Sequence, residues 1–326
     1  MIRTMIRRGP LCCVPWLLTA CSLSVSELDD YRREGDALLV DRAGGADAGS
    51  DAAAGDAGAA GVDATCGGGT SLCVELSGLK AHVDEMVVVT LGAADTVRAR
   101  AIFDPMSADD GSAVEQRQDL RFVLPAALAG TDVPQRLQIF TDHDSNHDRT
   151  YTPPPDDPTA PHPDHAWVVD VPSDGVVRFQ HNAEFANLRA DPLRPIGGDF
   201  RITLLRMGEF HSGEALHLWV YHLGTSERVV GYYRLPEIPA APCDAAVSPL
   251  CAEGQDDALV LVIPGILDER ERYEVQILAD RTADGRFEPN SEDHSWRFFF
   301  EANAVGYDGS FEHNAEFEDL DPVPEF

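Results

Sequence analysis

His181-Asn182-Ala183-Glu184-Phe185 occurs twice in this chain, the second time as His313-Asn314-Ala315-Glu316-Phe317. Two other matched pairs precede the copies in the same order: Asp164-His165-Ala166-Trp167 with Asp293-His294-Ser295-Trp296, and Leu137–Asp142 with Val275–Asp280. The offset between the copies is 129 residues for His165 and His294, and 132 residues for His181 and His313. A unit of about 120 residues is therefore duplicated, which is domain size and longer than the period of a solenoid.

Apolar and β-branched residues occur in short runs bounded by proline, glycine and aspartate, a pattern typical of strands. In the first unit the predicted strands are Met86–Leu91, Val97–Phe103, Leu120–Leu124, Leu137–Thr141, Trp167–Val171 and Val176–His181. In the second they are Arg201–Leu205, Ala215–Tyr221, Arg228–Leu235, Ala258–Ile263, Tyr273–Leu278, Trp296–Glu301 and Ser310–His313. Six or seven strands per unit without a clear helix predict an all-β protein with two tandem antiparallel, immunoglobulin-like β-sandwich domains.

The predicted domains are residues 73–191 and 199–322, separated by a proline- and glycine-rich boundary. Residues 21–72 are rich in aspartate, alanine and glycine, which predicts a disordered linker because such a segment buries little apolar surface. A short apolar run after Arg3, Arg7 and Arg8 makes residues 1–20 a signal peptide.

Leu18-Thr19-Ala20-Cys21 resembles the lipobox of bacterial lipoproteins. This resemblance implies lipidation of Cys21, a location in the cell envelope and, because Ser22 follows rather than aspartate, the outer membrane. An ordinary secretory signal is the alternative interpretation. Four cysteines then remain, and an oxidising compartment favours the local disulfides Cys66–Cys73 and Cys243–Cys251 over a zinc site.

The net charge of −31 disfavours nucleic acid and anionic lipid as partners. Membrane attachment is therefore expected through the acylated cysteine. The acidity serves solubility in the simplest interpretation, and some carboxylates are candidates for binding divalent cations.

One loop of the first unit has oxygen ligands on alternate residues and resembles the leading part of calcium loops. Its candidate ligands are Asp142, Asp144, Asn146 and Asp148, with Asp164 completing the shell. His147 replaces the glycine of an EF-hand, so the site would be a calcium loop on a β scaffold. An unoccupied turn rich in Asp and Asn is the alternative.

The matching loop of the second unit offers fewer ligands: Asp280, Asp284 and Asp293. A carboxylate is replaced by Thr282, which predicts weaker calcium binding or none.

Three histidines recur in both units. The pairs are His82 with His211, His165 with His294, and His181 with His313. They form an alternative, transition-metal site if they converge, whereas histidines that cap loops or bond carbonyls are the commoner case. The tryptophans after His165 and His294 are expected in the core.

No catalytic motif is found, and the repeated pentapeptide has an architectural character, so the chain is predicted not to be an enzyme. The loop, D-H-[AS]-W and H-N-A-E-F series resembles repeat modules of secreted bacterial proteins, which implies location and fold but no reaction. The leading hypothesis is a binding or structural module for an extracellular or envelope ligand. A glycan is one alternative ligand, for which an aromatic platform is needed; the candidates are Trp219, Tyr221, Tyr232 and Tyr233.

Overall fold

The computed structural model describes residues 66, 70–82, 85–93, 96–104, 119–142, 151, 164–183, 185–186, 197–224, 227–244, 248, 250–281 and 293–317. The chain divides into two units, 1–52 and 53–326, and all described residues belong to the second. The predicted signal peptide, Cys21 and most of the linker lie outside the described residues.

The described residues form strands almost throughout, which confirms the all-β prediction. The first repeat contains β1 (Leu72–Ser77), the 3-10 turn η1 (Leu79–His82), β2 (Met86–Ala93), β3 (Thr96–Phe103), β4 (Leu120–Leu124), β5 (Arg136–Asp142), β6 (His165–Asp170) and β7 (Val176–Gln180). The second contains β8 (Gly198–Leu205), the short helix α3 (Met207–His211), β9 (Ala215–His222), β10 (Arg228–Leu235), β11 (Ala258–Leu267), β12 (Arg272–Asp280), β13 (His294–Glu301) and β14 (Gly306–Glu312).

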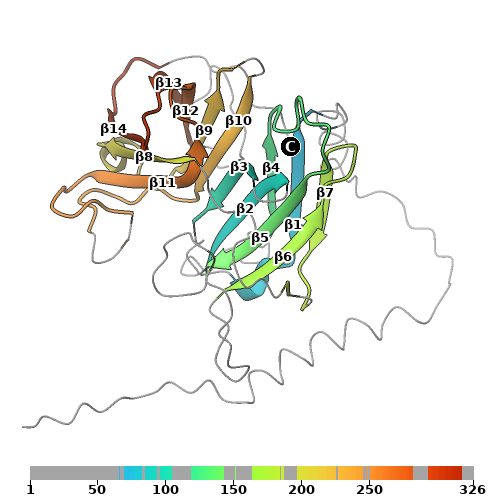
Figure 1. The fold of residues 1–326 in the computed structure, drawn as a ribbon. Helices are drawn as coiled ribbons and strands as arrows, with labels where there is room; N and C mark the ends of the chain where they lie inside the picture. The colour runs from blue at the N-terminus through green and yellow to red at the C-terminus, as the bar shows by residue number, and fades with distance from the viewer. Residues whose placement is uncertain are drawn as a thin grey trace, which may run out of the picture. The chain divides into compact units, whose positions relative to one another are not determined.

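The strands form three sheets, and the largest of them contains strands of both repeats (Figure 1). Its order is β13-β12-β9-β10-β3-β2-β5-β6, and the smaller sheets are β4-β1-β7 and β11-β8-β14. The two repeats therefore have matching strand arrangements of three and four strands. The prediction of two separate immunoglobulin-like sandwiches is not confirmed, because the four-stranded parts are joined in one sheet.

The joint between the repeats is a parallel pairing of β3 with β10, with Arg100 opposite Gly231. Side chains reinforce it, since the Tyr233 hydroxyl donates a hydrogen bond to the Asp104 carboxylate. A Cβ atom at Gly231 would lie 2.5 Å from Ile266 Cδ1 of β11, so a larger residue here would require that side chain to move. The two repeats are thus joined by strand pairing as well as by the polypeptide segment that connects them.

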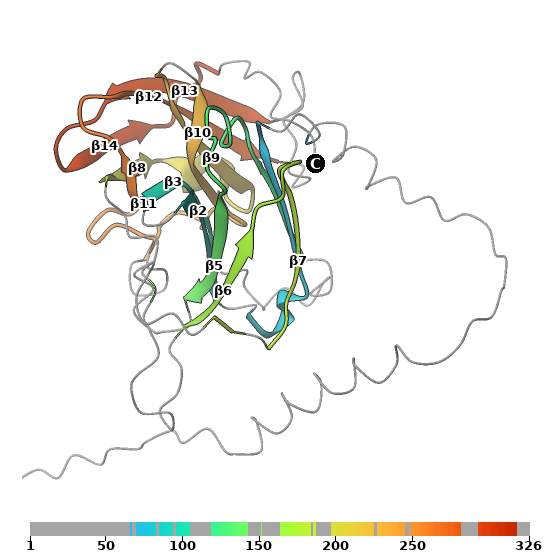
Figure 2. The same ribbon diagram turned by 45° about the vertical axis from the view of Figure 1, so that its right-hand side comes forward.

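The large sheet is covered on both faces, by different small sheets (Figure 2). Alternate residues of β2 show this: Val87 and Val89 pack in a cluster with Leu72 and Phe122 of the first small sheet, whereas Val88 packs with Phe200 of the second. Side chains of a strand alternate between faces, so neighbouring residues enter different cores. Each core contains residues of both repeats.

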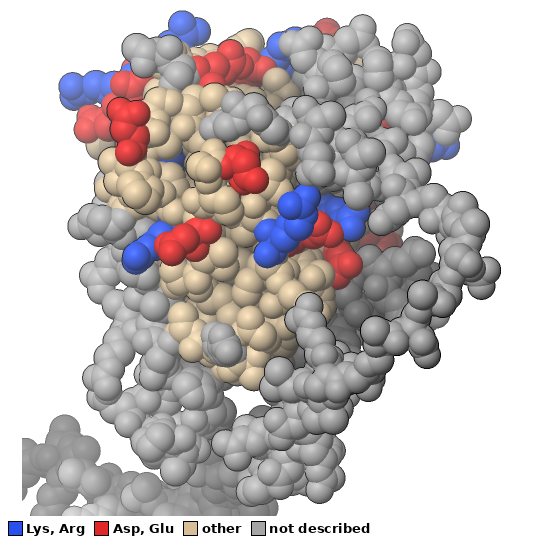
Figure 3. Space-filling model, turned by 90° about the vertical axis from the view of Figure 1, so that its right-hand side faces the viewer, with Lys and Arg blue, Asp and Glu red and all other residues tan. Residues whose placement is uncertain are grey.

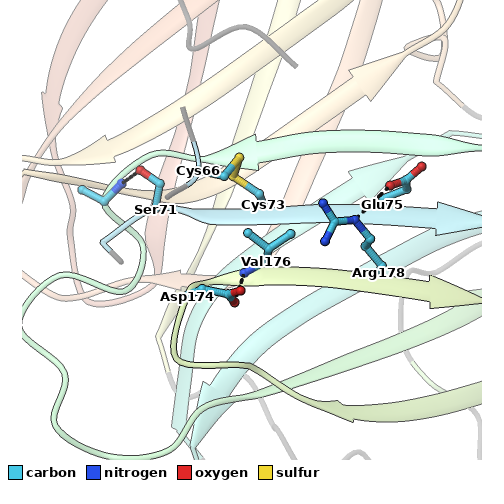
Figure 4. Close-up of a disulfide and its surroundings, with 8 residues drawn as sticks. Cys66, Ser71, Cys73, Glu75, Asp174, Val176 and Arg178 are labelled. Atoms are coloured by element: carbon cyan, nitrogen blue, oxygen red, sulfur yellow. Dashed lines mark hydrogen bonds and ion pairs between the residues drawn. A yellow bond between two sulfur atoms is a disulfide. The ribbon is translucent and has the colours of Figure 1, made fainter. Parts of the chain in front are cut away.

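Both predicted disulfides are present, Cys66–Cys73 and Cys243–Cys251. Figure 4 shows the first at the beginning of β1, with Glu75 further along the strand beside Arg178 of β7. Glu75 Oε2 lies 3.7 Å from Arg178 Nε, and its Oε1 lies 2.7 Å from Arg121 NH2 of β4. The pairs connect the three strands of this sheet at its surface, where such contacts stabilise a protein only slightly.

Candidate functional site: two histidine clusters

The three repeated histidines of the first unit come from separate segments that meet at one place. His82 ends η1, His165 begins β6, and His181 follows β7 directly. The parallel pairing of β7 with β1 brings His181 to the end of β1, where its N–H donates to the Ser77 carbonyl at 2.9 Å. In the second repeat, the parallel pairing of β14 with β8 places His313 in the same way, with its N–H 3.0 Å from the Leu205 carbonyl oxygen.

His82 lies between the other two rings of the first cluster and is 4% exposed. Its ring centroid is 5.3 Å from that of His165 and 5.1 Å from that of His181. The Nε2 atoms of His82 and His181 are 3.1 Å apart and form a hydrogen bond with each other. The sequence separations of these residues did not predict that they lie close together. Their recurrence in both units did identify them as candidate site residues.

The second cluster repeats this arrangement around His211, which is 3% exposed. Its ring centroid is 5.1 Å from that of His294 and 5.1 Å from that of His313. The His211 Nε2 atom is buried and makes no hydrogen bond within the described part of the chain. The two repeats therefore share one arrangement of three imidazoles on corresponding strands.

A glutamate orients the central histidine of each cluster. Glu85 Oε2 lies 2.8 Å from His82 Nδ1, and Glu214 Oε2 lies 2.7 Å from His211 Nδ1. A carboxylate accepts the Nδ1 proton, so this hydrogen bond assigns the tautomer that leaves a lone pair on Nε2. Sequence analysis did not name these glutamates as site residues, although each follows its histidine at the same three-residue spacing.

The tryptophan and phenylalanine that recur in both repeats pack against the imidazoles. Trp167 is 2% exposed, its Nε1 donates to the Asn182 carbonyl at 3.1 Å, and Phe185 stacks on His165 at 4.1 Å between centroids. The second repeat has the same contacts, Trp296 to Asn314 at 3.1 Å and Phe317 on His294 at 3.9 Å. The expectation that both tryptophans lie in the core is met, and D-H-[AS]-W and H-N-A-E-F recur because they meet in space.

Burial keeps the imidazoles of His181, His294 and His313 neutral. Burial, followed by the charge of His82, lowers the pKa of His181 to about 4, and Glu85 opposes the shift. Burial, followed by the charge of His211, also lowers the pKa values of His294 and His313. A neutral imidazole is the form that binds metal ions, so the clusters hold usable donors at neutral pH.

The spacing of the donors suits a metal ion in part. Two imidazole nitrogens at zinc–nitrogen distance in tetrahedral geometry are about 3.3 Å apart, close to the observed separation of 3.1 Å. Among the described residues, no group of three or more His, Cys, Asp or Glu side chains already has the arrangement of a metal centre. Two nitrogens are thus in position in the first cluster, and the third ring lies beside them.

The predicted calcium ligands of the first unit lie partly outside the described residues, namely Asp144, Asn146 and Asp148. Thr141 pairs with His165, which places Asp142 at the end of β5 opposite Asp164. Both are buried, with 0% and 2% of their surface exposed. The two carboxylates therefore flank the predicted loop at its base.

The weaker second site has the same base, whereas Asp284 lies outside the described residues. Ala279 pairs with His294, so Asp280 lies opposite Asp293. Here other groups face the carboxylates: the Arg281 N–H donates to Asp293 Oδ1 at 3.0 Å, and His217 Nε2 lies 3.6 Å from Asp280 Oδ2.

The aromatic residues considered for glycan binding do not form an exposed platform. Trp219, Tyr232 and Tyr233 are 3%, 4% and 0% exposed. Tyr221 is half-buried and packs against the first small sheet's core. Packing in the cores accounts for these residues.

The surface shown in Figure 3 carries acidic and basic side chains side by side. Within the described residues, no helix is long and apolar enough to cross a membrane. Comparisons with protein-family models, with characterised proteins and with solved structures found no match to this chain.

Proposed function

We propose that this protein is a lipid-anchored protein of the cell envelope in which each repeat binds one divalent transition-metal ion at its histidine cluster. The observation that carries the proposal is the approach of His82 Nε2 to His181 Nε2, at 3.1 Å, with the His82 ring oriented by Glu85. A carboxylate on the far nitrogen of a ligand histidine is a regular feature of metal sites, because it fixes the ring and increases its basicity. No reaction is proposed.

The energetics of the second cluster favour a ligand over a purely architectural role. Buried polar nitrogens cost stability unless they are bonded, and the His211 Nε2 atom makes no hydrogen bond with described residues. A metal ion would use the lone pairs that the glutamates direct toward the cluster. A proton would not serve as well, since the pKa of His181 is held near 4.

The donor set narrows the choice of ion. The clusters offer imidazole nitrogens, and the four cysteines outside the N-terminal segment form disulfides. Imidazole suits zinc, copper and nickel, while calcium and magnesium prefer oxygen. Zinc is the ion we expect first.

The setting follows from the lipobox-like Leu18–Cys21 and the linker after it. Such an anchor would hold the folded unit at the outer membrane, with no requirement for a charged membrane surface. Each repeat is proposed to be one immunoglobulin-like sandwich module, and the duplication would give two metal sites on one chain. A binding module of this type retains metal at the envelope or presents it to a partner.

The test is the metal content of the full chain, purified without a histidine tag, stripped with chelator and dialysed against Zn²⁺. We expect two ions per chain, one after His82→Ala or His211→Ala, and none after both changes. His222→Ala is the matched control, because His222 contacts Glu271 outside the clusters and its loss leaves two ions. Absence of bound zinc from the unaltered protein, or retention of both ions by the double variant, would overturn the proposal.

Calcium at the base of the first acidic loop is a second candidate, supported by the opposed, buried Asp142 and Asp164. Like charges directly opposite on neighbouring strands destabilise a sheet, and a shared cation removes this repulsion. Millimolar calcium is then expected to stabilise the protein by about 2 to 3 kcal/mol, observed as a higher melting temperature. Asp164→Asn should abolish the rise and Asp293→Asn, the matched change in the second repeat, should not. An unchanged melting temperature in the unaltered protein contradicts this assignment.

A further inference from the structure

The large sheet ends in a strand of a different repeat on each side, β13 at one edge and β6 at the other. Among the described strands, β13 pairs with β12 and β6 pairs with β5. The two edge strands correspond in the repeat, since Trp296 in β13 matches Trp167 in β6. An edge strand pairs readily with another chain unless its sequence prevents it, so the two edges can be compared for this property.

Strand β13 directs the backbone groups of Phe299 and Glu301 away from β12. The Ala302 N–H donates to the Glu271 carbonyl oxygen at 3.0 Å. Because this bond flanks the pairing of Arg272 with Glu301, those two residues form a non-hydrogen-bonded pair. The two kinds of pair alternate along an antiparallel ladder, so Phe299 has the same orientation as Glu301. Both residues therefore present N–H and C=O groups at the outer side of the sheet edge.

The side chains on one face of β13 are complementary to themselves. Arg297, Phe299 and Glu301 lie on the same face because the side chains of a strand alternate. Phe299 is 56% exposed, and Glu301 is also exposed. If a second β13 pairs antiparallel with Phe299 opposite Phe299, Arg297 of each copy lies opposite Glu301 of the other. Aromatic pairs and opposite charges at directly opposed positions stabilise a sheet, so this register is favourable.

The other face of β13 also carries aromatic side chains at the edge. The Phe298 ring stacks on Phe311 with the centroids 6.0 Å apart, and the Phe300 ring lies 4.1 Å from that of Tyr307. Phe298 and Phe300 pack against the core of the second repeat and are only partly buried. In the same register Phe298 lies opposite Phe300 of the other copy. A second β13 would therefore cover apolar surface on both faces of the sheet.

Strand β6 is protected from the same pairing. At the position of Phe299 it has Asp170, whose side chain is 86% exposed and whose Oδ1 lies 3.2 Å from Arg136 Nε. The same register would place Asp170 opposite Asp170, and like charges directly opposite destabilise a sheet. Pro172, at the position of Glu301, has no N–H to donate. Charge and proline are regular means of blocking an edge, so of these two edges β13 is the one open to pairing.

We propose that two copies of the chain pair through β13, with Phe299 opposite Phe299, and form a closed dimer with one continuous sheet. The dimer is independent of the proposed metal binding. An extended peptide of another protein can also add to an edge strand, but the self-complementary order of Arg297, Phe299 and Glu301 favours a second copy. Both copies use the same patch and β6 is blocked, so assembly stops at two.

The experiment is sedimentation equilibrium of the full chain at about 1 to 100 µM, a range that covers weak to moderate self-association. EDTA is present throughout, so that no shared metal ion joins two copies. We expect a monomer–dimer equilibrium. Phe299→Lys should leave the chain monomeric, because it places two like charges opposite each other. Val168→Lys is the matched control on β6, where Val168 is 40% exposed, and should leave the equilibrium unchanged.

An exchange of charges tests the register. Glu301→Arg should weaken the dimer by about tenfold, because an arginine then lies opposite Arg297 of the other copy. Arg297→Glu combined with Glu301→Arg restores opposite charges across the pair and should restore the affinity. Circular dichroism and the melting temperature of each variant at low concentration show whether the monomer remains folded.

The results that overturn the dimer are specific. A monomer at every concentration of the unaltered chain excludes it, and so does a dimer that Phe299→Lys leaves intact. Association beyond two copies contradicts closure through β13. A dimer that Glu301→Arg weakens and the exchanged pair fails to restore contradicts the antiparallel register. Zinc content is a separate measurement, so none of these results decides the proposed metal binding.

Discussion

Replacement of Trp167 by alanine is expected to destabilise the protein by about 3 to 5 kcal/mol, as is usual for a fully buried tryptophan. Its ring supports all three imidazoles of the first cluster, with centroid distances of 5.8 Å to His82, 6.5 Å to His165 and 5.3 Å to His181. Alanine leaves a cavity at this point and removes the Nε1 donor to the Asn182 carbonyl. Urea denaturation at neutral pH measures the loss.

Trp167→Phe is the matched control, because it keeps an aromatic ring but lacks the N–H donor. Its cost should lie well below that of the alanine variant, and Trp296→Ala should match Trp167→Ala, given the equivalent bond from Trp296 to Asn314. A loss under about 1 kcal/mol in Trp167→Ala would be too small for a buried support and would contradict this interpretation.

Acidification from pH 7.5 to pH 5.0 is expected to destabilise the metal-free protein through its histidine clusters. Burial, before any other cause, lowers the pKa of His181 to about 4 and lowers those of His217, His294 and His313. An unfolded histidine has a pKa near 6.5. Between about pH 6.5 and pH 4 the unfolded chain therefore binds more protons than the folded one, and stability falls as the pH falls.

The loss is expected to be roughly 1 to 2 kcal/mol for the first cluster by pH 5.0, a value reduced to allow for the partial exposure of His181, and the second cluster should change in the same direction. Most carboxylates remain charged at this pH, so the histidines dominate the change. Urea midpoints at the two pH values measure it. His181→Asn with His313→Asn should flatten the dependence, and equal midpoints at both pH values in the unaltered protein would exclude protonation of the clusters as its cause.

Much of the strand pattern was predictable because it depends on local sequence. The runs at Arg228–Leu235 and Leu120–Leu124 coincide with β10 and β4. Strand β1 was missed because its six residues, Leu72–Ser77, follow a glycine-rich segment and are short. Helix α3 was also missed, since five residues are too few to show helical periodicity.

The joining of the repeats into one sheet was not predicted, because strand pairing between edges leaves no local pattern. One signal was nevertheless present. Strand β2 reads Met-Val-Val-Val-Thr-Leu-Gly and is buried on both faces, and continuous apolar runs of this kind indicate strands that lie between two layers. In a separate two-layer sandwich, one face of such a strand would pack in the core and the other would face solvent.

The sequence identified some residues of the histidine clusters, and it did so only because they recur in both repeats. His82, His165 and His181 were selected because each has a counterpart, but strands carry no information about which loops meet at their ends. Glu85 and Glu214 also recur, and only their hydrogen bonds to His82 and His211 show what they do.

The parallel pairing of β3 with β10 determines the geometry of the contact between the repeats. Corresponding strands lie side by side in the same direction, with Arg100 opposite Gly231, an offset of 131 residues that falls within the repeat spacing. Two identical polypeptides related by a twofold axis along these strands would meet in this same way. The contact between the repeats therefore has the geometry of a subunit interface, although it lies inside one polypeptide.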